Sequence, residues 1–123
     1  MKRIKVLLVD DQVLFVKSLN IVLKTQSDRI DVVGIAYDGS EALQIIEHRK
    51  PDVVFLDIRM PNMNGVECTR AIKARWPEIK VILLSLYPDY QAEALAAGAD
   101  AFFSKSDATD HLRKTIKEVI QKV

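Results

Sequence analysis

Five polar residues of this chain could do chemistry together, because each stands at the end of a short apolar run. Asp10 and Asp11 follow one run, Asp57 a second, Ser85 a third and Lys105 a fourth. Carboxylates held at close range repel each other, and they keep their charge most easily around a cation. Oxygen ligands without cysteine or histidine select a hard ion, and Mg²⁺ is the first choice. The set therefore predicts a magnesium site.

The same residues favour chemistry on a phosphoryl group. A carboxylate such as Asp57, placed beside Mg²⁺, is a possible nucleophile toward phosphorus. The positive charges of the metal and Lys105 would stabilise the negative charge that moves onto the phosphoryl oxygens in the transition state. Ser85 could donate a hydrogen bond to the same oxygens.

The elements that must position these residues alternate between two patterns, β-branched apolar runs and stretches with helical spacing. The runs predict strands at Ile4–Val9, Ile30–Ala36, Val53–Leu56, Ile79–Leu84 and Ala101–Ser104. Apolar stripes with helical spacing predict four helices. The four stripes comprise Phe15, Leu19, Val22 and Leu23; Ala42, Leu43 and Ile46; Val66, Thr69, Ile72 and Trp76; and Leu112, Ile116, Val119, Ile120 and Val123. An alanine-rich stretch near Gln91–Ala97 predicts one further helix.

Turn-forming and capping residues agree with these boundaries. Asp38, followed by Gly39 and Ser40, can turn the chain and cap the second helix. Pro61 and Gly65 come before the third helix, Gly98 ends the fourth, and Asp107 can cap the fifth; Trp76 and Pro77 close the third.

Five strands alternating with five helices predict a parallel sheet covered on both faces. Right-handed crossovers make this a doubly wound α/β domain. In such sheets the binding crevice lies outside the carboxyl ends of the strands. All five polar residues follow strand ends, so we expect them to meet at one edge.

Length and composition indicate one globular domain in a reducing compartment. The chain has 123 residues, with 49% hydrophobic and 28% charged, and its net charge of +1 does not argue for nucleic-acid binding. Cys68 is the only cysteine, so no internal disulfide can form. No stretch approaches the ~18 apolar residues of a membrane-spanning helix, and the start lacks a signal-peptide pattern. We expect a cytoplasmic protein with no membrane contact.

Four segments together resemble the receiver domain of two-component response regulators: "VLLVDDQ", "VVFLDIRMPNMNG", "VILLSL" and "GADAFFSK". The segments "RAIKARWPEIKVILLS" and "FFSKSD" are most similar to the NarL/FixJ subfamily, whose members usually carry a helix-turn-helix DNA-binding domain. The resemblance implies a flavodoxin-like sheet in strand order 2-1-3-4-5. It implies a single receiver domain over residues 1–123, with the output domain absent from this chain.

The resemblance also implies a role for each residue of the acidic site. Asp57 resembles the aspartate that accepts a phosphoryl group from a sensor histidine kinase. Asp11 resembles the direct Mg²⁺ ligand, with Asp10 acting mainly through water, and the backbone carbonyl of Arg59 would complete the protein ligands.

The remaining roles concern the switch. Ser85 resembles the hydroxyl that moves onto the phosphoryl group, and Lys105 resembles the lysine that pairs with it. Phe102 resembles the aromatic residue that turns inward upon activation, and strand alternation then points Phe103 to the opposite face. Phosphorylation is expected to change the surface of the fourth helix, fifth strand and fifth helix and to favour a homodimer. DNA would be contacted only through the output domain, and the protein would catalyse only its own phosphoryl transfer and dephosphorylation.

Two features between Ser85 and Lys105, and one directly after Lys105, differ from the common family pattern. The segment looks slightly shorter than usual and contains Pro88, so the fourth helix is expected to be short, shifted or partly disordered. Leu86 is bulkier than the small residue often found after the hydroxyl, which would restrict access of small phosphodonors or water. Ser106 stands where many receivers have proline, in keeping with the subfamily.

Three other functions are open. A haloacid-dehalogenase-type phosphatase would need Asp-x-Asp, but Gln12 and Arg59 stand two places after Asp10 and Asp57. A nucleotide-binding module would need a glycine-rich phosphate loop, and none follows the first strand. A pseudo-receiver would use the same fold only as an interaction surface.

Other reactive residue types are assigned structural positions. His48 and His111 are expected on the surface, and Cys68 is expected to pack against the core. A basic cluster is expected on a solvated helix face, and it comprises Arg70, Lys73 and Arg75.

Overall fold

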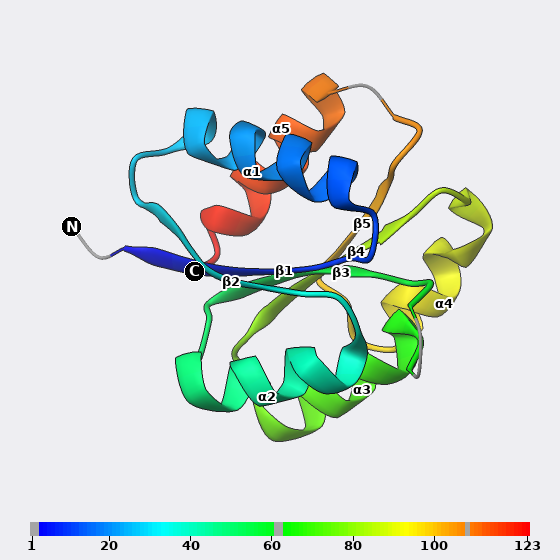
Figure 1. Ribbon diagram of the computed structural model, residues 1–123. Helices are drawn as coiled ribbons and strands as arrows, with labels where there is room; N and C mark the ends of the chain where they lie inside the picture. Colours follow the sequence, from blue (N-terminus) through cyan, green and yellow to red (C-terminus); the bar gives the residue numbers. More distant parts are fainter. Residues whose placement is uncertain (1–2, 61–62, 108) are drawn as a thin grey trace.

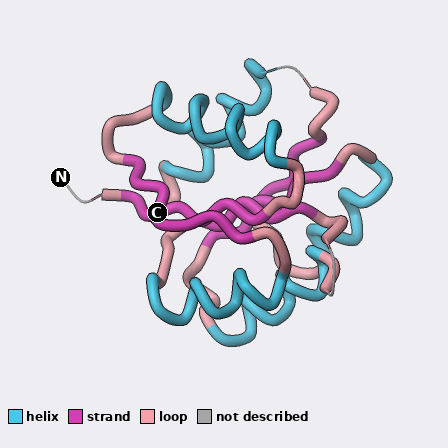
Figure 2. Tube along the Cα trace, viewed as in Figure 1, coloured by secondary structure: helices cyan, strands magenta, loops and turns pink. Residues whose placement is uncertain are grey.

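A parallel five-stranded sheet lies between two layers of helices in the computed structural model, which describes residues 3–60, 63–107 and 109–123 (Figure 1 and Figure 2). The strand order is β2-β1-β3-β4-β5. The doubly wound α/β fold and the order 2-1-3-4-5 expected from the sequence are therefore confirmed. The prediction for Pro61 lies outside the described residues.

The strands run within one residue of the predicted bounds. They are β1 (Ile4–Val9), β2 (Ile30–Ala36), β3 (Val53–Asp57), β4 (Lys80–Ser85) and β5 (Ala101–Ser104). The helices are α1 (Val13–Gln26), α2 (Gly39–Arg49), α3 (Gly65–Arg75), α4 (Gln91–Ala96) and α5 (Thr109–Ile120), with a 3-10 turn η1 (Pro88–Tyr90) before α4.

Each face of the sheet has its own apolar cluster. Val6 and Leu8 of β1 pack with α1 and α5, whereas Leu7 and Val9 pack on the opposite side with α2, α3 and α4. Figure 1 shows α1 and α5 on one face, with α2 and α3 on the other. The central strands are buried on both sides, which explains their uninterrupted apolar runs.

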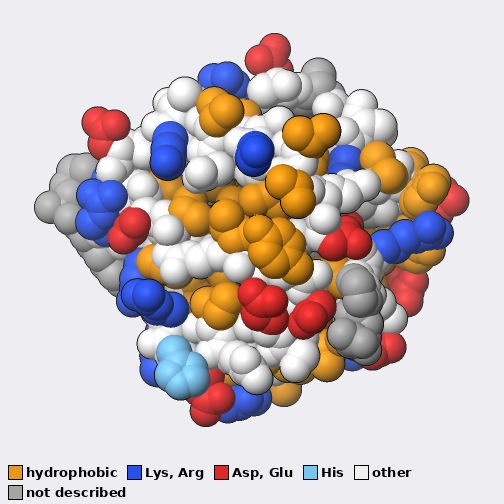
Figure 3. Space-filling model, viewed as in Figure 1, with side chains coloured by type: hydrophobic (Ala, Val, Ile, Leu, Met, Phe, Trp, Pro, Cys, Tyr) orange, Lys and Arg blue, Asp and Glu red, His pale blue; other side chains and the backbone are white. Residues whose placement is uncertain are grey.

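β2 is less enclosed because it is an edge strand. Its middle residues are only partly buried, in contrast to those of β1 and β3. On the face seen in Figure 3, apolar side chains gather where Figure 1 places β2 between α1 and α2. Leu14 and Ile21 of α1 are also exposed, at 80% and 64%. No helix of the described residues has the length and apolarity needed to span a membrane.

Two apolar stripes differ from the prediction. In α1 the residue that enters the core is Val16, whereas Phe15 is only partly buried. Phe15 turns toward the sheet edge, where its ring lies against Lys105. Val123 was expected on the stripe of α5, but the helix ends at Ile120 and Val123 is 44% exposed.

Most predicted helix boundaries are confirmed by hydrogen bonds. Asp38 Oδ1 accepts from the backbone N–H of Glu41 at 2.8 Å, which caps α2. Trp76 closes α3 through its N–H to the carbonyl of Ile72. The position before Thr109 is not among the described residues, so the capping role of Asp107 stays a prediction.

The segment that connects β4 to β5 contains the shortest helix of the described residues. α4 has six residues, and it follows η1, which begins at Pro88. Proline is accepted at the first position of a helical turn because that position lacks an N–H partner anyway. Gly98 follows α4 with a φ of 103°, a left-handed conformation that glycine adopts without strain. The short fourth helix expected from the sequence is confirmed.

Candidate functional site

The carboxyl ends of four strands bring the predicted site residues to one edge of the sheet. Asp10 directly follows β1, Asp57 and Ser85 are the last residues of β3 and β4, and Lys105 directly follows β5. Carboxylate oxygens of Asp10, Asp11 and Asp57 all lie within 4.8 Å of one another. Sequence reasoning placed these residues together, and the geometry confirms it.

The ammonium of Lys105 lies inside this acidic group. Its Nζ is 2.6 Å from Asp10 Oδ2 and 3.5 Å from Asp57 Oδ1, and its side chain is only 4% exposed. Nζ also donates a hydrogen bond to Gln12 Oε1 at 2.6 Å and lies 4.6 Å from the centre of the Phe15 ring. One buried ammonium thus contacts two of the three acids, Asp10 and Asp57.

The residues fit a divalent cation. When all three carboxylates are ionised, they carry three negative charges against the single positive charge of Lys105, which leaves two uncompensated. Asp10 is 1% exposed, and its Oδ2 atom has no hydrogen bond from a described residue, so the Lys105 contact is an ion pair only. Buried charged oxygens without donors are costly, and a hard metal ion would satisfy them.

Burial raises the pKa of Asp57 from 3.8 to about 7, and the neighbouring charge of Asp10 adds to the rise. Lys105 acts in the opposite direction but does not cancel these effects. The carboxyl of Asp57 therefore gives up its proton less readily than an ordinary aspartate when no other cation is present. Only the anion is a nucleophile, so a cation at this site would favour the reactive form.

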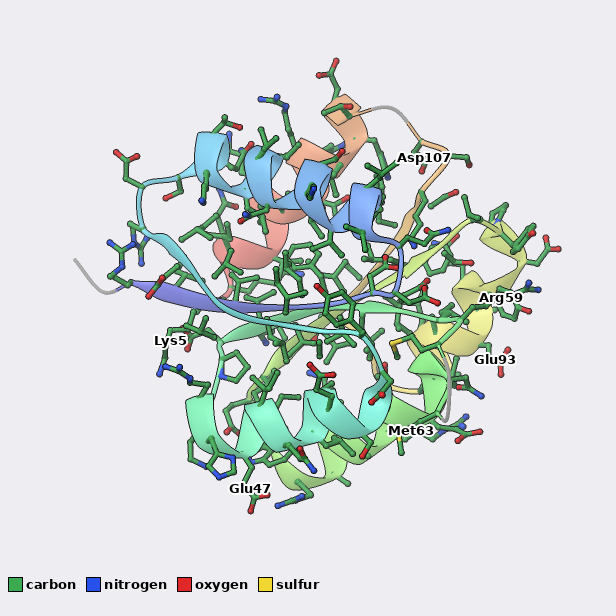
Figure 4. The ribbon with its side chains drawn as sticks, in the orientation of Figure 1. Lys5, Glu47, Arg59, Met63, Glu93 and Asp107 are labelled. Atoms are coloured by element: carbon green, nitrogen blue, oxygen red, sulfur yellow. The ribbon has the colours of Figure 1, made fainter. Side chains whose placement is uncertain are left out.

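A cavity of about 290 Å³ opens beside Asp57. Its lining comprises Asp11, Gln12, Asp57, Arg59, Ser85, Leu86, Tyr87 and Lys105. Figure 4 shows Arg59 at the side of the molecule where the strands end, and its guanidinium lies 4.8 Å from the centre of the Tyr87 ring. The metal-binding role of the Arg59 carbonyl stays a prediction.

Ser85 is buried, and its hydroxyl points into the loop that follows β4. Its Oγ accepts a hydrogen bond from the backbone N–H of Tyr87 at 2.9 Å, and its carbonyl accepts from the N–H of Lys105 at 2.6 Å. The hydroxyl keeps its own proton free to donate. Ser85 therefore connects the acidic edge with the segment that leads to α4.

Phe102 and Phe103 occupy opposite faces of β5, as strand alternation predicted. Phe102 is partly buried against the cluster of α2, α3 and α4, whereas Phe103 lies in the cluster of α1 and α5. The Phe103 ring stacks on His111 with 5.6 Å between ring centres. The switch role of Phe102 is not tested by these contacts.

The loop after Asp57 is held close to the sheet by Gly65. The N–H of Gly65 donates to the carbonyl of Ile58 at 2.7 Å. A Cβ atom at this position would overlap the carbonyl oxygen of Asp57 and would lie 2.7 Å from the Cα of Ile58. Only glycine permits this approach, which fixes the start of α3 beside the acidic site.

Sequence reasoning missed some contacts and misplaced one residue. Gln12 and Phe15 hold Lys105, and the only signal in the sequence is that Gln12 directly follows the acidic pair. Lys73 was expected on a solvated face, but its Nζ donates to the carbonyl of Ile79 at 2.6 Å and lies 2.6 Å from Asp100 Oδ2. That prediction was wrong because the acidic partner comes from a distant part of the chain.

The residues assigned to structural positions lie where they were expected. Cys68 is fully buried, and burial raises the pKa of its thiol to about 12, which makes it a poor nucleophile. His48 and His111 are exposed on α2 and α5.

Residues 6–117 match the family model described as the response regulator receiver domain. The chain belongs to this family. Membership in the receiver family replaces the dehalogenase-type and phosphate-loop alternatives, whose Asp-x-Asp and glycine-rich motifs this sequence lacks.

The chain is similar to curated regulatory proteins that are about twice as long. The transcriptional regulatory protein DegU of Brevibacillus brevis is 35% identical over 121 residues, which cover 97% of this chain and 51% of DegU. The response regulator protein VraR of Staphylococcus aureus is 40% identical over 118 residues, which cover 91% of this chain and 56% of VraR. The receiver chain spans about half the length of these relatives.

Solved structures agree with the fold and with the NarL/FixJ resemblance. The signal receiver domain of the putative response regulator NarL from Mycobacterium tuberculosis has a TM-score of 0.88 at 31% identity, with 98% of each chain covered. The CheY structure from Borrelia burgdorferi, solved as a CheX-CheY-BeF3-Mg+2 complex, has a TM-score of 0.87 at 28% identity, covering 97% of this chain and 90% of that one.

Proposed function

We propose that this receiver domain accepts a phosphoryl group on Asp57 from a sensor histidine kinase, with Mg²⁺, and controls transcription through an output domain. The observation that carries the proposal is the meeting of three carboxylates within 4.8 Å, with the Lys105 ammonium among them. Such a site combines a nucleophile with two means of neutralising a phosphoryl group.

The chain offers an all-oxygen ligand set for the metal. We assign direct ligation to the carboxylates of Asp11 and Asp57 and to the backbone carbonyl of Arg59, with Asp10 acting through water. The two uncompensated charges of the cluster and the unsatisfied Oδ2 of Asp10 support this assignment. When bound, Mg²⁺ supplies charge neutralisation to the phosphoryl oxygens.

The phosphoryl transfer itself requires one nucleophile. A carboxylate oxygen of Asp57 forms a bond to phosphorus while the bond between phosphorus and the imidazole nitrogen of the kinase breaks. The nitrogen keeps the electron pair of that bond, and the imidazole leaves as a neutral ring because the other ring nitrogen of the phosphohistidine carries a proton. Lys105 is close enough to Asp57 to pair with the transferred group, at 3.5 Å from Oδ1.

The switch follows from the hydrogen bond that Ser85 makes in this structure. Moving the Ser85 hydroxyl onto the phosphoryl oxygens would give up the bond from the Tyr87 N–H, and Tyr87 directly precedes η1 and α4. Phe102 would then turn inward, and the surface of α4, β5 and α5 would change. A two-state segment biased by a new charge is the usual form of such switches.

The output is proposed from the relatives. DegU carries the name of a transcriptional regulatory protein, and this chain covers about half of it. We propose that a helix-turn-helix domain contacts DNA, that phosphorylation favours a homodimer, and that the protein acts in the cytoplasm. Catalysis would be limited to its own phosphoryl transfer and dephosphorylation.

The decisive experiment incubates the protein with Mg²⁺ and a small phosphodonor and measures intact mass. One added phosphoryl group, absent from Asp57→Asn and from samples without metal, is the expected result. Failure of the wild-type protein to accept a phosphoryl group from either a small donor or a histidine kinase would favour a pseudo-receiver that acts only as an interaction surface. Turnover of free phosphate esters would favour an enzyme.

A further inference from the structure

The ammonium of Lys105 is held by a neutral group as well as by acids. Gln12 Oε1 accepts from Nζ at 2.6 Å, a distance equal to that between Nζ and Asp10 Oδ2. The Phe15 ring lies 4.6 Å from Nζ and closes the remaining side. The Lys105 side chain is only 4% exposed as a result.

Gln12 is poorly suited to the place it occupies in its own helix. It is the N-cap residue of α1, yet its side chain makes no capping hydrogen bond. Serine, threonine, aspartate and asparagine are preferred at this position because their short side chains reach the first free N–H groups. A residue that departs from the N-cap preference without stabilising its own helix indicates a functional constraint. The side chain of Gln12 instead reaches Lys105, 93 positions away in sequence.

Metal binding is expected to affect the individual contacts of Lys105 differently. The Lys105 ammonium donates a hydrogen bond to Gln12, and it forms ion pairs with Asp10 Oδ2 at 2.6 Å and Asp57 Oδ1 at 3.5 Å. The contact with Asp10 competes with a cation for the same carboxylate. The contact with Gln12 uses a neutral carboxamide oxygen and none of the three carboxylates.

We infer that Gln12 is a positioning residue that holds the Lys105 ammonium beside Asp57 both before and after the phosphoryl group arrives. The Phe15 ring packs against the same ammonium. The inference rests on the proposed function, in which Lys105 pairs with the group on Asp57. A lysine side chain loses much rotamer freedom when it is fixed. Because Gln12 already fixes the Lys105 side chain in the unphosphorylated protein, little further conformational entropy is lost when the phosphoryl group binds.

The test uses Gln12→Met, which keeps a side chain of similar length but removes the acceptor, and Gln121→Met as the matched control on the exposed C-terminal turn. The probe is beryllofluoride with Mg²⁺, titrated by calorimetry. Loss of a hydrogen bond to a charged group predicts about tenfold weaker binding for Gln12→Met. Gln121→Met should bind as the wild type does. Unchanged or tighter binding by Gln12→Met overturns the inference.

A second variant separates positioning from folding. Gln12→Ser provides a better helix cap, so we expect a higher melting temperature together with weaker beryllofluoride binding. A merely structural role for Gln12 predicts that melting temperature and binding change in the same direction.

A double-mutant cycle with Lys105→Met shows whether Gln12 acts through Lys105. In the Lys105→Met background, Gln12→Met should cause no further loss of affinity. Equal losses in both backgrounds would show that Gln12 acts by another route and would overturn the inference.

A readout without metal or phosphoryl chemistry distinguishes failure of this inference from failure of the proposed function. The amine of Lys105 should react with a labelling reagent several-fold faster in metal-free Gln12→Met than in the wild type, with Lys73 as the internal reference. Unchanged labelling overturns the inference even if the wild type binds beryllofluoride. A wild type that binds none, with labelling changed as expected, removes the proposed function but leaves the contact.

Discussion

Aspartates stand at both ends of this sheet, and the two ends use them differently. At the amino ends of β3 and β5, Asp52 and Asp100 bind the neighbouring strand through backbone and side chain. Asp52 donates its N–H to the carbonyl of Lys5 at 2.8 Å and accepts the N–H of Lys5 on Oδ2 at 2.8 Å. Asp100 makes the same pair of bonds with Val81, each at 2.8 Å, and Lys73 adds an ion pair.

At the carboxyl ends of β1 and β3, Asp10 and Asp57 are buried against each other. Oδ1 of Asp10 accepts from the N–H of Gln12 at 2.9 Å, but Oδ2 has no hydrogen bond from a described residue. Burial raises the pKa of Asp57 to about 7, and the neighbouring charge of Asp10 adds to the rise. The comparison teaches that a satisfied strand-end aspartate joins strands, whereas an unsatisfied one is available to bind a cation and react.

The largest expected effect comes from a change confined to the carboxyl ends of the strands, where Asp57 lies. Asp57→Asn should abolish phosphoryl uptake, because the amide cannot act as the nucleophile, and it should leave the fold intact because a buried charge is removed. Asp52→Asn is the matched change at the other end, and it should retain uptake while it lowers stability. Intact-mass measurement after treatment with a phosphodonor, together with thermal melts of both variants, checks the pair. Full uptake by Asp57→Asn would falsify the assignment of the phosphoacceptor.

The next largest effect comes from a change at the amino ends of the strands, where Asp100 lies. Asp100→Ala removes a hydrogen bond to the Val81 N–H and leaves the part-buried Lys73 without its acid. We expect the free energy of unfolding to fall by about 2–3 kcal/mol. Urea denaturation measures the loss, and phosphoryl uptake by the folded fraction should be unchanged. A loss of uptake at native stability would contradict the division of roles between the two ends.

A third change disturbs the backbone that carries Asp57. Gly65→Ala brings a Cβ onto the carbonyl oxygen of Asp57, and overpacking of this kind costs about 1–3 kcal/mol. Gly34→Ala is the control, because there the added Cβ meets only side-chain atoms of Ile45 and Leu7, at 3.3 and 3.4 Å. Urea denaturation should rank Gly65→Ala well below Gly34→Ala in stability, and equal stabilities would contradict the backbone contact.

The last comparison changes pH and metal instead of a residue. The folded pKa of Asp57 is about 7 and its ordinary value is 3.8. Between these values the folded state binds more protons than the unfolded state, so the contribution of Asp57 to stability declines as pH rises from about 4 to about 7 and then stays constant. Thermal melts of metal-free protein should show this decline, and Asp57→Asn should lack it.

Mg²⁺ should offset part of this decline. We expect millimolar Mg²⁺ to raise the melting temperature by a few degrees above neutral pH, which corresponds to roughly 1 kcal/mol. The rise should be smaller in acid, where protons compete for the same carboxylates. Circular dichroism melts with and without Mg²⁺ measure the difference, and Asp52→Asn should respond as the wild type does. An identical response for wild type and Asp11→Ala would contradict ligation by Asp11.

Much of the fold was predictable because its signals are local. Continuous apolar runs marked the buried strands, and Asp38 and Gly98 marked helix boundaries by their own backbone preferences. The acidic edge was predictable too, because parallel strands always place their carboxyl ends together. The prediction failed for Val123, because sequence periodicity does not show where a helix ends.

The sequence by itself determined the strand order expected from the family resemblance, the convergence of Asp10, Asp57 and Lys105, and the short α4. Only the tertiary structure decided that Gln12 and Phe15 hold Lys105 and that Lys73 pairs with Asp100. It also decided that Asp57 has a raised pKa while Asp52 joins two strands. The physical reason is that strand and helix patterns are set by neighbours in sequence, whereas the environment of a charge depends on which distant residues fold against it.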